Sequence, residues 1–577
     1  MNIIAYGFIH PIIGIFTGLL LIFGSEFLGQ LLLKKNKYSS FFLNLAVGVI
    51  LVSLIAYIVV LLGQSQYINP IISYFIIILG LYNFIYFIKI KIYLDYRLNF
   101  YSYLIFFYLL SLFLISISAP TMADALDYHL GVAKFIHNYH HFPNHNYSIH
   151  FAISGLGEIF NFLGLIVYSD VAGSLLQLIS LASFLYYFSK VILDKSKYTL
   201  FCLFILSSPV IIYFVSGPKY QLFPQLITTF VLYLLIITKN LNIKLSLLLL
   251  FLIFGAASMK LNFFITGFIL GIFLLIKSRI NFNFVISALI LILFFFLPKA
   301  LFNFFTLENF TYINFITSAP VNFLKQLKNY NESNFFFPLG LIIPISFGKI
   351  STILGFQFLI LFLIKKFDRE NIEIFIVAII SSIFLYFMAQ PIGRIFHEII
   401  LFLSLNIIFA KKYKFNINSI NCFSAINVMV VFAISIFGVL SLSPSLINNY
   451  YRKEVMSINA HYYKGADWVN KIIPSENIIL TNIRSTVLLN AKAIQTLSPA
   501  QIDDINNYYN FLKKLKINYI VIMNFDSKID YFFKECNLEF VNQSPKFITE
   551  KRNFFNRNEQ YSVTIFKLKN ATVKNCI

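Results

Sequence analysis

The chain has 577 residues, of which 59% are hydrophobic and 12% are charged, against a charged share of about 25% in soluble proteins. This composition excludes a soluble multidomain enzyme, a disordered chain and a coiled coil. The formal charge of +21 therefore raises the question of which side of a membrane the Lys and Arg residues face. The composition predicts a polytopic membrane protein.

Apolar segments recur along the first three quarters of the chain, and a helix needs about 20 apolar residues to cross the hydrocarbon core. We expect the first segment to be retained, because the N-terminus lacks a basic region and an obvious cleavage site. Residues 120–170 are amphipathic, and the run Phe151–Val167 within them predicts an interfacial helix. The 14 predicted spans are 8–33, 41–63, 69–90, 101–119, 171–190, 198–215, 222–238, 244–259, 261–277, 281–298, 339–364, 371–389, 396–411 and 420–442.

The charge of the connecting loops predicts their orientation. With the N-terminus outside, the inner loops carry 19 Lys/Arg, whereas the outer loops up to residue 442 carry eight. Because Lys and Arg concentrate on the inner side, the sequence predicts an N-terminus and a C-terminal region that both lie outside. The predicted inner loops are 34–40, 89–97, 190–197, 239–244, 277–279, 365–373 and 411–414.

The predicted fold class is an all-α polytopic membrane protein with a small soluble α/β domain at its C-terminus. Residues 1–100 form an N-terminal extension of three helices, and 101–442 form a membrane core with long outer loops at 120–170 and 299–338. The composition of residues 443–577 predicts a soluble domain. In this tail the pattern predicts helices at Tyr462–Ile473 and Asp503–Lys516, and strands at Asn477–Thr481, Ile517–Met523 and Tyr561–Lys567.

Acidic residues that could do chemistry open the first outer loop. Asp124 and Asp127 follow the span that ends at Pro120, and His129 comes next. A carboxylate in a cleft at the membrane surface can act as a general base on a hydroxyl, or with a His it can hold a divalent metal. The alternative is a solvated loop in which the two Asp residues cap a helix start.

Isolated cations lie at the predicted outer ends of three later spans. They are Lys219, Lys260 and Arg394. Ionisable residues near membrane depth are costly and often functional, and Arg suits bidentate binding of a phosphate. The alternative is snorkelling of the side chains to the lipid headgroups. Because the three cations are predicted on the same outer face as the two Asp residues, we favour a site that binds an anion.

Six of the nine His residues lie within residues 120–170, and His137 and His141 have a spacing that could chelate a metal. There is no HExxH motif, and the four Cys residues form no CxxC pair. We therefore expect no metal and no other cofactor, although a divalent metal stays an alternative.

The layout of these residues resembles the GT-C superfamily of integral-membrane glycosyltransferases, which includes protein mannosyltransferases and lipid A aminoarabinose transferases. The matching features are the acid Asp124 in a first outer loop, juxtamembrane helices within 131–167, the small-residue run Gly255–Lys260, the late outer Arg394, and an outer domain at 443–577. The resemblance covers roughly residues 100–577.

This resemblance implies an inverting transfer of a sugar from a polyprenyl-phosphate-linked donor to a glycolipid, glycan or protein hydroxyl. Asp124 would be the base, with Asp127 and His129 beside it, and Lys260, Arg394 and Lys219 would contact the donor phosphate. The expected location is a bacterial inner membrane, and the expected partners are lipids and not nucleic acid. The rival functions are a transporter or flippase, or a polymerase, of lipid-linked glycans.

Overall fold

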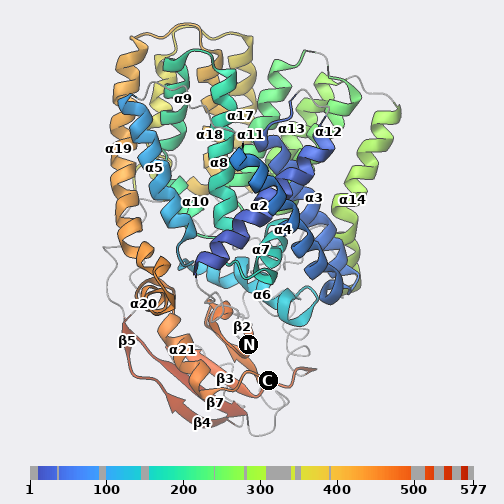
Figure 1. The fold of residues 1–577 in the computed structure, drawn as a ribbon, viewed down its shortest axis with the longest axis vertical. Helices are drawn as coiled ribbons and strands as arrows, with labels where there is room; N and C mark the ends of the chain where they lie inside the picture. Colours follow the sequence, from blue (N-terminus) through green and yellow to red (C-terminus); the bar gives the residue numbers. More distant parts are fainter. Residues whose placement is uncertain are drawn as a thin grey trace.

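The computed structural model confirms a helical membrane protein with a small C-terminal sheet (Figure 1). Within the part of the chain that the structure describes, eight helices are long and apolar enough to cross a membrane. The structure describes residues 11–34, 38–89, 99–143, 155–239, 241–260, 262–278, 282–306, 339–344, 352–388, 392–495, 514–524, 538–548 and 560–568.

The helices begin where the apolar runs begin, and polar caps fix several starts. Ser40, Asn99 and Asn242 each accept a hydrogen bond from a backbone N–H of the first turn that follows. The N-terminal three quarters contains α2 (Pro11–Leu33), α3 (Phe41–Leu61), α4 (Ser65–Lys89), α5 (Phe100–Ile117), η1 (Ala125–His129), α6 (Leu130–Tyr139), α7 (Leu156–Ile166), α8 (Ala172–Val191), α9 (Lys195–Leu206), α10 (Val210–Val215), α11 (Leu222–Ile237), α12 (Ile243–Met259), α13 (Phe263–Lys277), α14 (Phe282–Thr306), η3 (Leu339–Leu341), η5 (Gln357–Leu363), α17 (Arg369–Met388), α18 (Gly393–Phe409) and α19 (Ile417–Leu442).

Two predicted spans differ from single α-helices. The span 198–215 is divided into α9 and α10, because Pro209 interrupts the helical hydrogen bonding after Ser207 and Ser208. The span 339–364 contains the short 3₁₀ segments η3 and η5 in its described parts, and residues 345–351 lie outside them. Here the apolar composition was a poor guide to the backbone.

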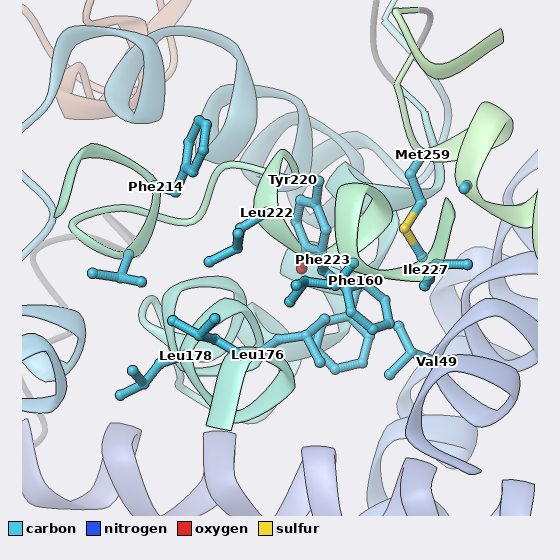
Figure 2. Packing of buried hydrophobic residues seen from close by; sticks show 14 of the residues in the cluster. Val49, Phe160, Leu176, Leu178, Phe214, Tyr220, Leu222, Phe223, Ile227 and Met259 are labelled. Atoms are coloured by element: carbon cyan, nitrogen blue, oxygen red, sulfur yellow. The ribbon is translucent and has the colours of Figure 1, made fainter. Parts of the chain in front are cut away.

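The predicted interfacial helix is enclosed by protein. Every residue of α7 is buried, and α7 packs against α3, α6, α8 and α12. A Cβ on Gly155 would lie 2.3 Å from the Ser258 carbonyl oxygen, and one on Gly157 would lie 2.4 Å from the Tyr220 ring. Glycine therefore allows the close approach that buries this helix. Figure 2 shows Phe160 of α7 in the same apolar cluster as Tyr220.

A buried polar cluster joins the three N-terminal helices. The carboxylate of Glu26 on α2 accepts hydrogen bonds from Asn44 on α3 at 3.0 Å and from Asn83 on α4 at 2.7 Å. Asn83 also donates to the backbone carbonyl of Phe23. These contacts hold α2, α3 and α4 together, because a buried polar group is costly unless it is hydrogen-bonded. Glu26 thus has a structural role.

Several of the predicted inner loops meet at one end of the helical region. Lys197 donates to the carbonyl oxygen of Ala410 at 2.6 Å, Lys411 pairs with Asp368 at 2.9 Å, and Lys277 pairs with Glu373 at 2.6 Å. These contacts bring 190–197, 277–279, 365–373 and 411–414 together. The C-terminal sheet lies at the opposite end (Figure 1), so the charge pattern correctly sorted these loops into one group.

The C-terminal region is a mixed five-stranded sheet with one helix packed on it. The strand order is β2-β1-β3-β7-β4, with β1 parallel to β2 and β3, and β7 antiparallel to β3 and β4. The elements are η6 (Ser443–Leu446), α20 (Asn449–Asn459), α21 (Tyr463–Ile472), β1 (Ile478–Thr481), η7 (Thr486–Leu488), β2 (Lys492–Gln495), β3 (Tyr519–Met523), β4 (Leu538–Gln543), β5 (Phe547–Ile548), β6 (Gln560–Tyr561) and β7 (Val563–Leu568).

The prediction of an α/β domain is confirmed, and α21, β1, β3 and β7 lie where the pattern placed them. The strands β2, β4 and β5 were missed, and the short strand β6 was not separated from β7. The predicted helix Asp503–Lys516 lies outside the described residues up to residue 513, as does most of the loop 299–338. The domain is tied to the membrane region by a buried ion pair between Arg452 on α20 and Asp170, which precedes α8.

We predict that Gly157→Ala destabilises the protein, since the added Cβ must displace the Tyr220 ring, and overpacking of this kind costs about 1–3 kcal/mol. Thermal unfolding of the detergent-purified protein measures the effect. The matched control is Gly271→Ala on α13, where a Cβ would meet nothing within 4 Å. Both changes raise helix propensity equally, so an equal unfolding temperature for the two variants would contradict the prediction.

Candidate active site at the base of the helical region

The first outer loop enters the site through a π-helical turn. After α5 ends at Ile117, the chain reaches Asp124 and then η1, which carries Asp127 and His129. A π turn is rare and often marks a functional position. Figure 1 shows α6, which continues from η1, between the helical region and the C-terminal sheet. The turn therefore lies where the two parts of the protein meet.

Asp124 is the centre of the site, because it contacts three distant parts of the chain. Its Oδ2 accepts hydrogen bonds from Arg394 Nη1 and from the Tyr213 hydroxyl, each at 3.0 Å. Its Oδ1 lies 3.4 Å from Arg484 Nη2. Arg394 also donates to the Tyr213 hydroxyl at 3.0 Å. The carboxylate is 22% exposed, so an approaching ligand can still reach it.

The surrounding cations keep Asp124 ionised. Burial acts to raise the pKa of Asp124, but Arg394, Lys219 and Arg484 oppose it and hold the pKa well below its usual value. The carboxylate therefore carries a negative charge throughout the physiological range. While both guanidiniums lie beside it, Asp124 is a weak base.

Asp127 faces the C-terminal domain. It is fully buried, and its Oδ2 accepts from Arg484 Nε and Nη2, each at 3.0 Å. Its Oδ1 accepts from Gln495 Nε2 at 3.0 Å. Both carboxylate oxygens are therefore engaged, and the geometry gives Asp127 the role of holding Arg484.

His129 bonds to Glu158 and not to Asp124. Its Nδ1 lies 2.6 Å from Glu158 Oε1, and the other oxygen of Glu158 accepts from the backbone N–H of Gly155. Burial lowers the pKa of His129 to about 4, with Glu158 opposing the shift. The neutral ring donates through Nδ1, and Nε2 is buried with no hydrogen-bond partner among the described residues.

The two predicted lysines line neighbouring parts of the site. Lys219 is buried, with Nζ 3.3 Å from the centre of the Tyr213 ring and 2.6 Å from the sulfur of Met122. Lys260 ends α12, and its Nζ lies 3.5 Å from the Tyr128 hydroxyl. Burial lowers the pKa of Lys260 to about 8. Lys219 thus contacts the ring of Tyr213, whose hydroxyl donates to Asp124. Lys260 lies beside Tyr128 instead.

One side chain of α7 fixes two of these loops. Asn161 Nδ2 donates to the backbone carbonyls of His129 at 3.2 Å and Pro218 at 3.0 Å, while its Oδ1 accepts from the Tyr220 hydroxyl at 3.1 Å. Asn161 therefore positions η1 and the segment that carries Lys219 relative to each other. This explains how residues 90 positions apart in the chain meet in one site.

The structure brings Asp124, Lys219 and Arg394 together around Tyr213, and their roles stay predictions. The sequence did not indicate the neighbouring Tyr213, Arg484, Gln495 and Glu158. Arg484 comes three residues after β1 ends at Thr481, so a charged residue soon after a buried strand was the available signal. Tyr213 was hidden inside an apolar span. A narrow crevice, with no room for a water molecule, adjoins Arg394 and is lined by Gln221, Gln225, Asn262, Phe263, Arg394, Ile395 and Glu398.

The His cluster does not form a metal site within the described residues. No group of three His, Cys, Asp or Glu is placed there to hold an ion. His129 is bonded to Glu158, and His141 Nδ1 lies 2.8 Å from the Phe142 carbonyl oxygen. His145 and His150 lie outside the described residues.

A buried lysine fastens the C-terminal domain beside the site. Lys134 on α6 donates to the carbonyl oxygens of Val487 at 2.9 Å and Leu489 at 2.5 Å. Burial lowers the pKa of Lys134 to about 7. The amine thus satisfies two buried carbonyls of the loop that also carries Arg484.

These features define a multi-pass membrane protein with a charged polar site at the junction of its helices and an extramembrane domain. The chain belongs to the family of the DUF1420 N-terminal domain, which its sequence matches over residues 91–456. A search of curated proteins found no match.

Two solved structures are similar to this chain in fold. One is ArnT from Cupriavidus metallidurans bound to undecaprenyl phosphate, with 10% identity, a TM-score of 0.45, and coverage of 82% of this chain and 99% of that one. The other is the apo state of the same protein, with 10% identity, a TM-score of 0.43, and coverage of 80% and 98%.

We predict that Lys134→Met lowers stability and removes a pH dependence. The wild-type amine has a pKa of about 7 when folded and an ordinary value of about 10.4 when unfolded. The unfolded chain therefore holds the extra proton between these values, and the wild type loses stability as the pH falls from about 10 to 7. The measurement is the unfolding temperature of the wild type minus that of Lys134→Met, recorded at several pH values across this range. We expect this difference to shrink as the pH falls.

Lys471→Met is the matched control for that measurement, because Lys471 is an exposed lysine of the same domain, paired with Asp467 at 2.7 Å. It should follow the wild type across the whole pH range. A wild-type curve that runs parallel to the Lys134→Met curve would show that Lys134 does not titrate with folding.

Proposed function

We propose that this protein is a membrane glycosyltransferase. It moves a sugar from a polyprenyl-phosphate-linked donor to a hydroxyl of a glycolipid, glycan or protein, with inversion at the anomeric carbon. The observation that carries the proposal is the contact between Asp124 and Arg394 at 3.0 Å. It brings together, from segments 270 residues apart, the two side chains to which the proposal gives the roles of base and phosphate-binding group.

The transfer would use these groups as follows. The acceptor oxygen attacks the anomeric carbon while Asp124 takes the hydroxyl proton. The bond from that carbon to the donor phosphate breaks, and the phosphate oxygen leaves with the electron pair. Arg394 and Lys260 stabilise the charge on the leaving polyprenyl phosphate. Asp124 later gives its proton to solvent or to the released phosphate.

The ion pair of the free protein suits this sequence of events. Asp124 is a weak base while Arg394 is beside it. A donor phosphate that binds Arg394 draws the guanidinium away from the carboxylate, which raises the basicity of Asp124. The base thus becomes active with the donor in place. The cations supply the charge stabilisation that a metal ion would otherwise give, and the proposal includes no metal.

The proposed location is the inner membrane of a bacterium, with the site and the C-terminal domain on the outer face. The support for this orientation is the excess of Lys and Arg in the loops that gather at the far end of the helices, including Lys197, Lys277 and Lys411. A flippase is less favoured, because the buried Glu26 is bonded to Asn44 and Asn83 and so serves helix packing.

We predict that Asp124→Asn lowers sugar transfer by about 10²-fold or more, the usual contribution of a general base, with normal abundance and membrane insertion. Asparagine keeps an oxygen that can accept from Arg394, so the fold is preserved. The measurement follows free polyprenyl phosphate released from labelled polyprenyl-phosphate sugars in native membranes, which can supply the unknown acceptor.

Asp467→Asn is the control for this experiment, since Asp467 is an exposed carboxylate of the C-terminal domain. It should keep wild-type release. Full activity of Asp124→Asn would remove Asp124 as the base. If wild-type membranes release nothing from any donor but move lipid-linked glycans across the bilayer, the protein is a flippase.

We also predict that Arg394→Ala weakens donor binding by about tenfold or more, because a charge-assisted hydrogen bond to the phosphate is lost. The KM for the lipid-linked donor, or its dissociation constant, measures this. Arg394→Ala should cost more free energy of donor binding than free energy of folding. The unfolding temperature reports the effect on folding. An unchanged donor affinity would place Arg394 outside the site.

A further inference from the structure

We infer that Arg484 of the C-terminal domain binds the phosphate of the lipid-linked donor, and that Asp127 is the positioning residue that holds its guanidinium in place. The inference rests on the proposed function and adds a residue from a different domain to that site. The donor site would then be complete only when the C-terminal domain is docked on the first outer loop.

The position of Arg484 is fixed from two sides. Its Nε and Nη2 both lie 3.0 Å from Oδ2 of the fully buried Asp127. Gln495 on β2 donates to Asp127 Oδ1 at 3.0 Å and to the backbone carbonyl of Arg484 at 3.1 Å. Two donors of the guanidinium thus converge on one oxygen of a carboxylate that Gln495 holds by its other oxygen, so Arg484 is held in one orientation before any ligand arrives.

The guanidinium still has donors to offer. An Arg side chain carries five N–H groups and no acceptor. In the described part of the chain, Asp124 and Asp127 engage Nε and Nη2, and Nη1 makes no hydrogen bond. The side chain is 42% exposed, although its partner Asp127 is fully buried. A partly exposed, preorganised guanidinium with a free N–H pair is suited to a phosphate oxygen.

Arg484 also lies beside Asp124, the proposed base, and close to Arg394. Its Nη2 is 3.4 Å from Oδ1 of Asp124, while Arg394 contacts Oδ2 of the same carboxylate at 3.0 Å. The two guanidiniums therefore flank one carboxylate. Because both guanidiniums contact the Asp124 carboxylate, a donor phosphate that binds Arg394 lies close to Arg484, and its two non-bridging oxygens can accept from one guanidinium each.

A purely structural role for Arg484 predicts a different outcome. If the residue only docks the domain through Asp127, its removal changes stability and leaves the affinity for phosphate intact. A variant that simply failed to fold would confuse the two roles, because Arg484→Gln leaves the buried Asp127 without its countercharge. The double variant Asp127→Asn with Arg484→Gln removes both charges together, so the buried site stays neutral.

The experiment measures binding of undecaprenyl phosphate and of undecaprenol to the purified full-length protein in detergent. The variants are Arg484→Gln, the double variant, and Lys471→Gln as a control that removes an exposed charge from the same domain. We expect wild type and Lys471→Gln to prefer the phosphate strongly. We expect Arg484→Gln and the double variant to bind it about tenfold more weakly or worse, with undecaprenol binding unchanged in all four proteins.

The outcomes separate the two proposals. If the wild type prefers the phosphate and the double variant binds it equally well, Arg484 only docks the domain and this inference is wrong. If the wild type does not distinguish the phosphate from the alcohol, the proposed function fails, and the inference fails with it. Unfolding temperatures recorded on the same samples confirm that the variants are folded.

Discussion

The ion pairs around Asp124 are the constraint on which the rest of the structure depends. A buried or half-buried charge is tolerated only when it is paired, and Asp124 obtains its partners from α18 and from the C-terminal domain. The first outer loop, the late helix and the soluble domain must therefore pack against one another. The same contacts leave an ionised carboxylate beside two guanidiniums, and the proposed transfer relies on this arrangement.

The scaffold behind this site is built from close packing. Gly155 and Gly157 let α7 approach α12 and Tyr220, and the buried α7 then presents Glu158 to His129 and Asn161 to two loop carbonyls. The polar groups of α7 thus influence the site by holding His129 and the loop carbonyls in place. Their contribution is positional: they fix where η1 lies, and so where Asp124 meets Arg394.

Much of this could be predicted from the sequence, because hydropathy and charge are local properties. The apolar runs located most of the helices, and the Lys/Arg pattern grouped the loops at one end. The acid and the cations that lie together in the structure were singled out in the sequence because charged residues are rare there. Arg484 and Tyr213 were missed, since their roles arise from contacts between distant segments. The burial of α7 by other helices was also missed, because its polar residues suggest a solvated face, whereas they bond inside the protein.

The fastening of the C-terminal domain has a consequence for how such proteins can diverge. Lys134 with Leu489, Asp127 with Arg484, and Arg452 with Asp170 each join the domain to the membrane region. A chimera that exchanges the domain alone keeps these contacts only if the incoming domain carries both Arg residues and presents the same two backbone carbonyls to Lys134. The domain and the loop that carries η1 and α6 therefore depend on each other. We expect domain exchange between relatives to succeed only when the domain and this loop are exchanged together.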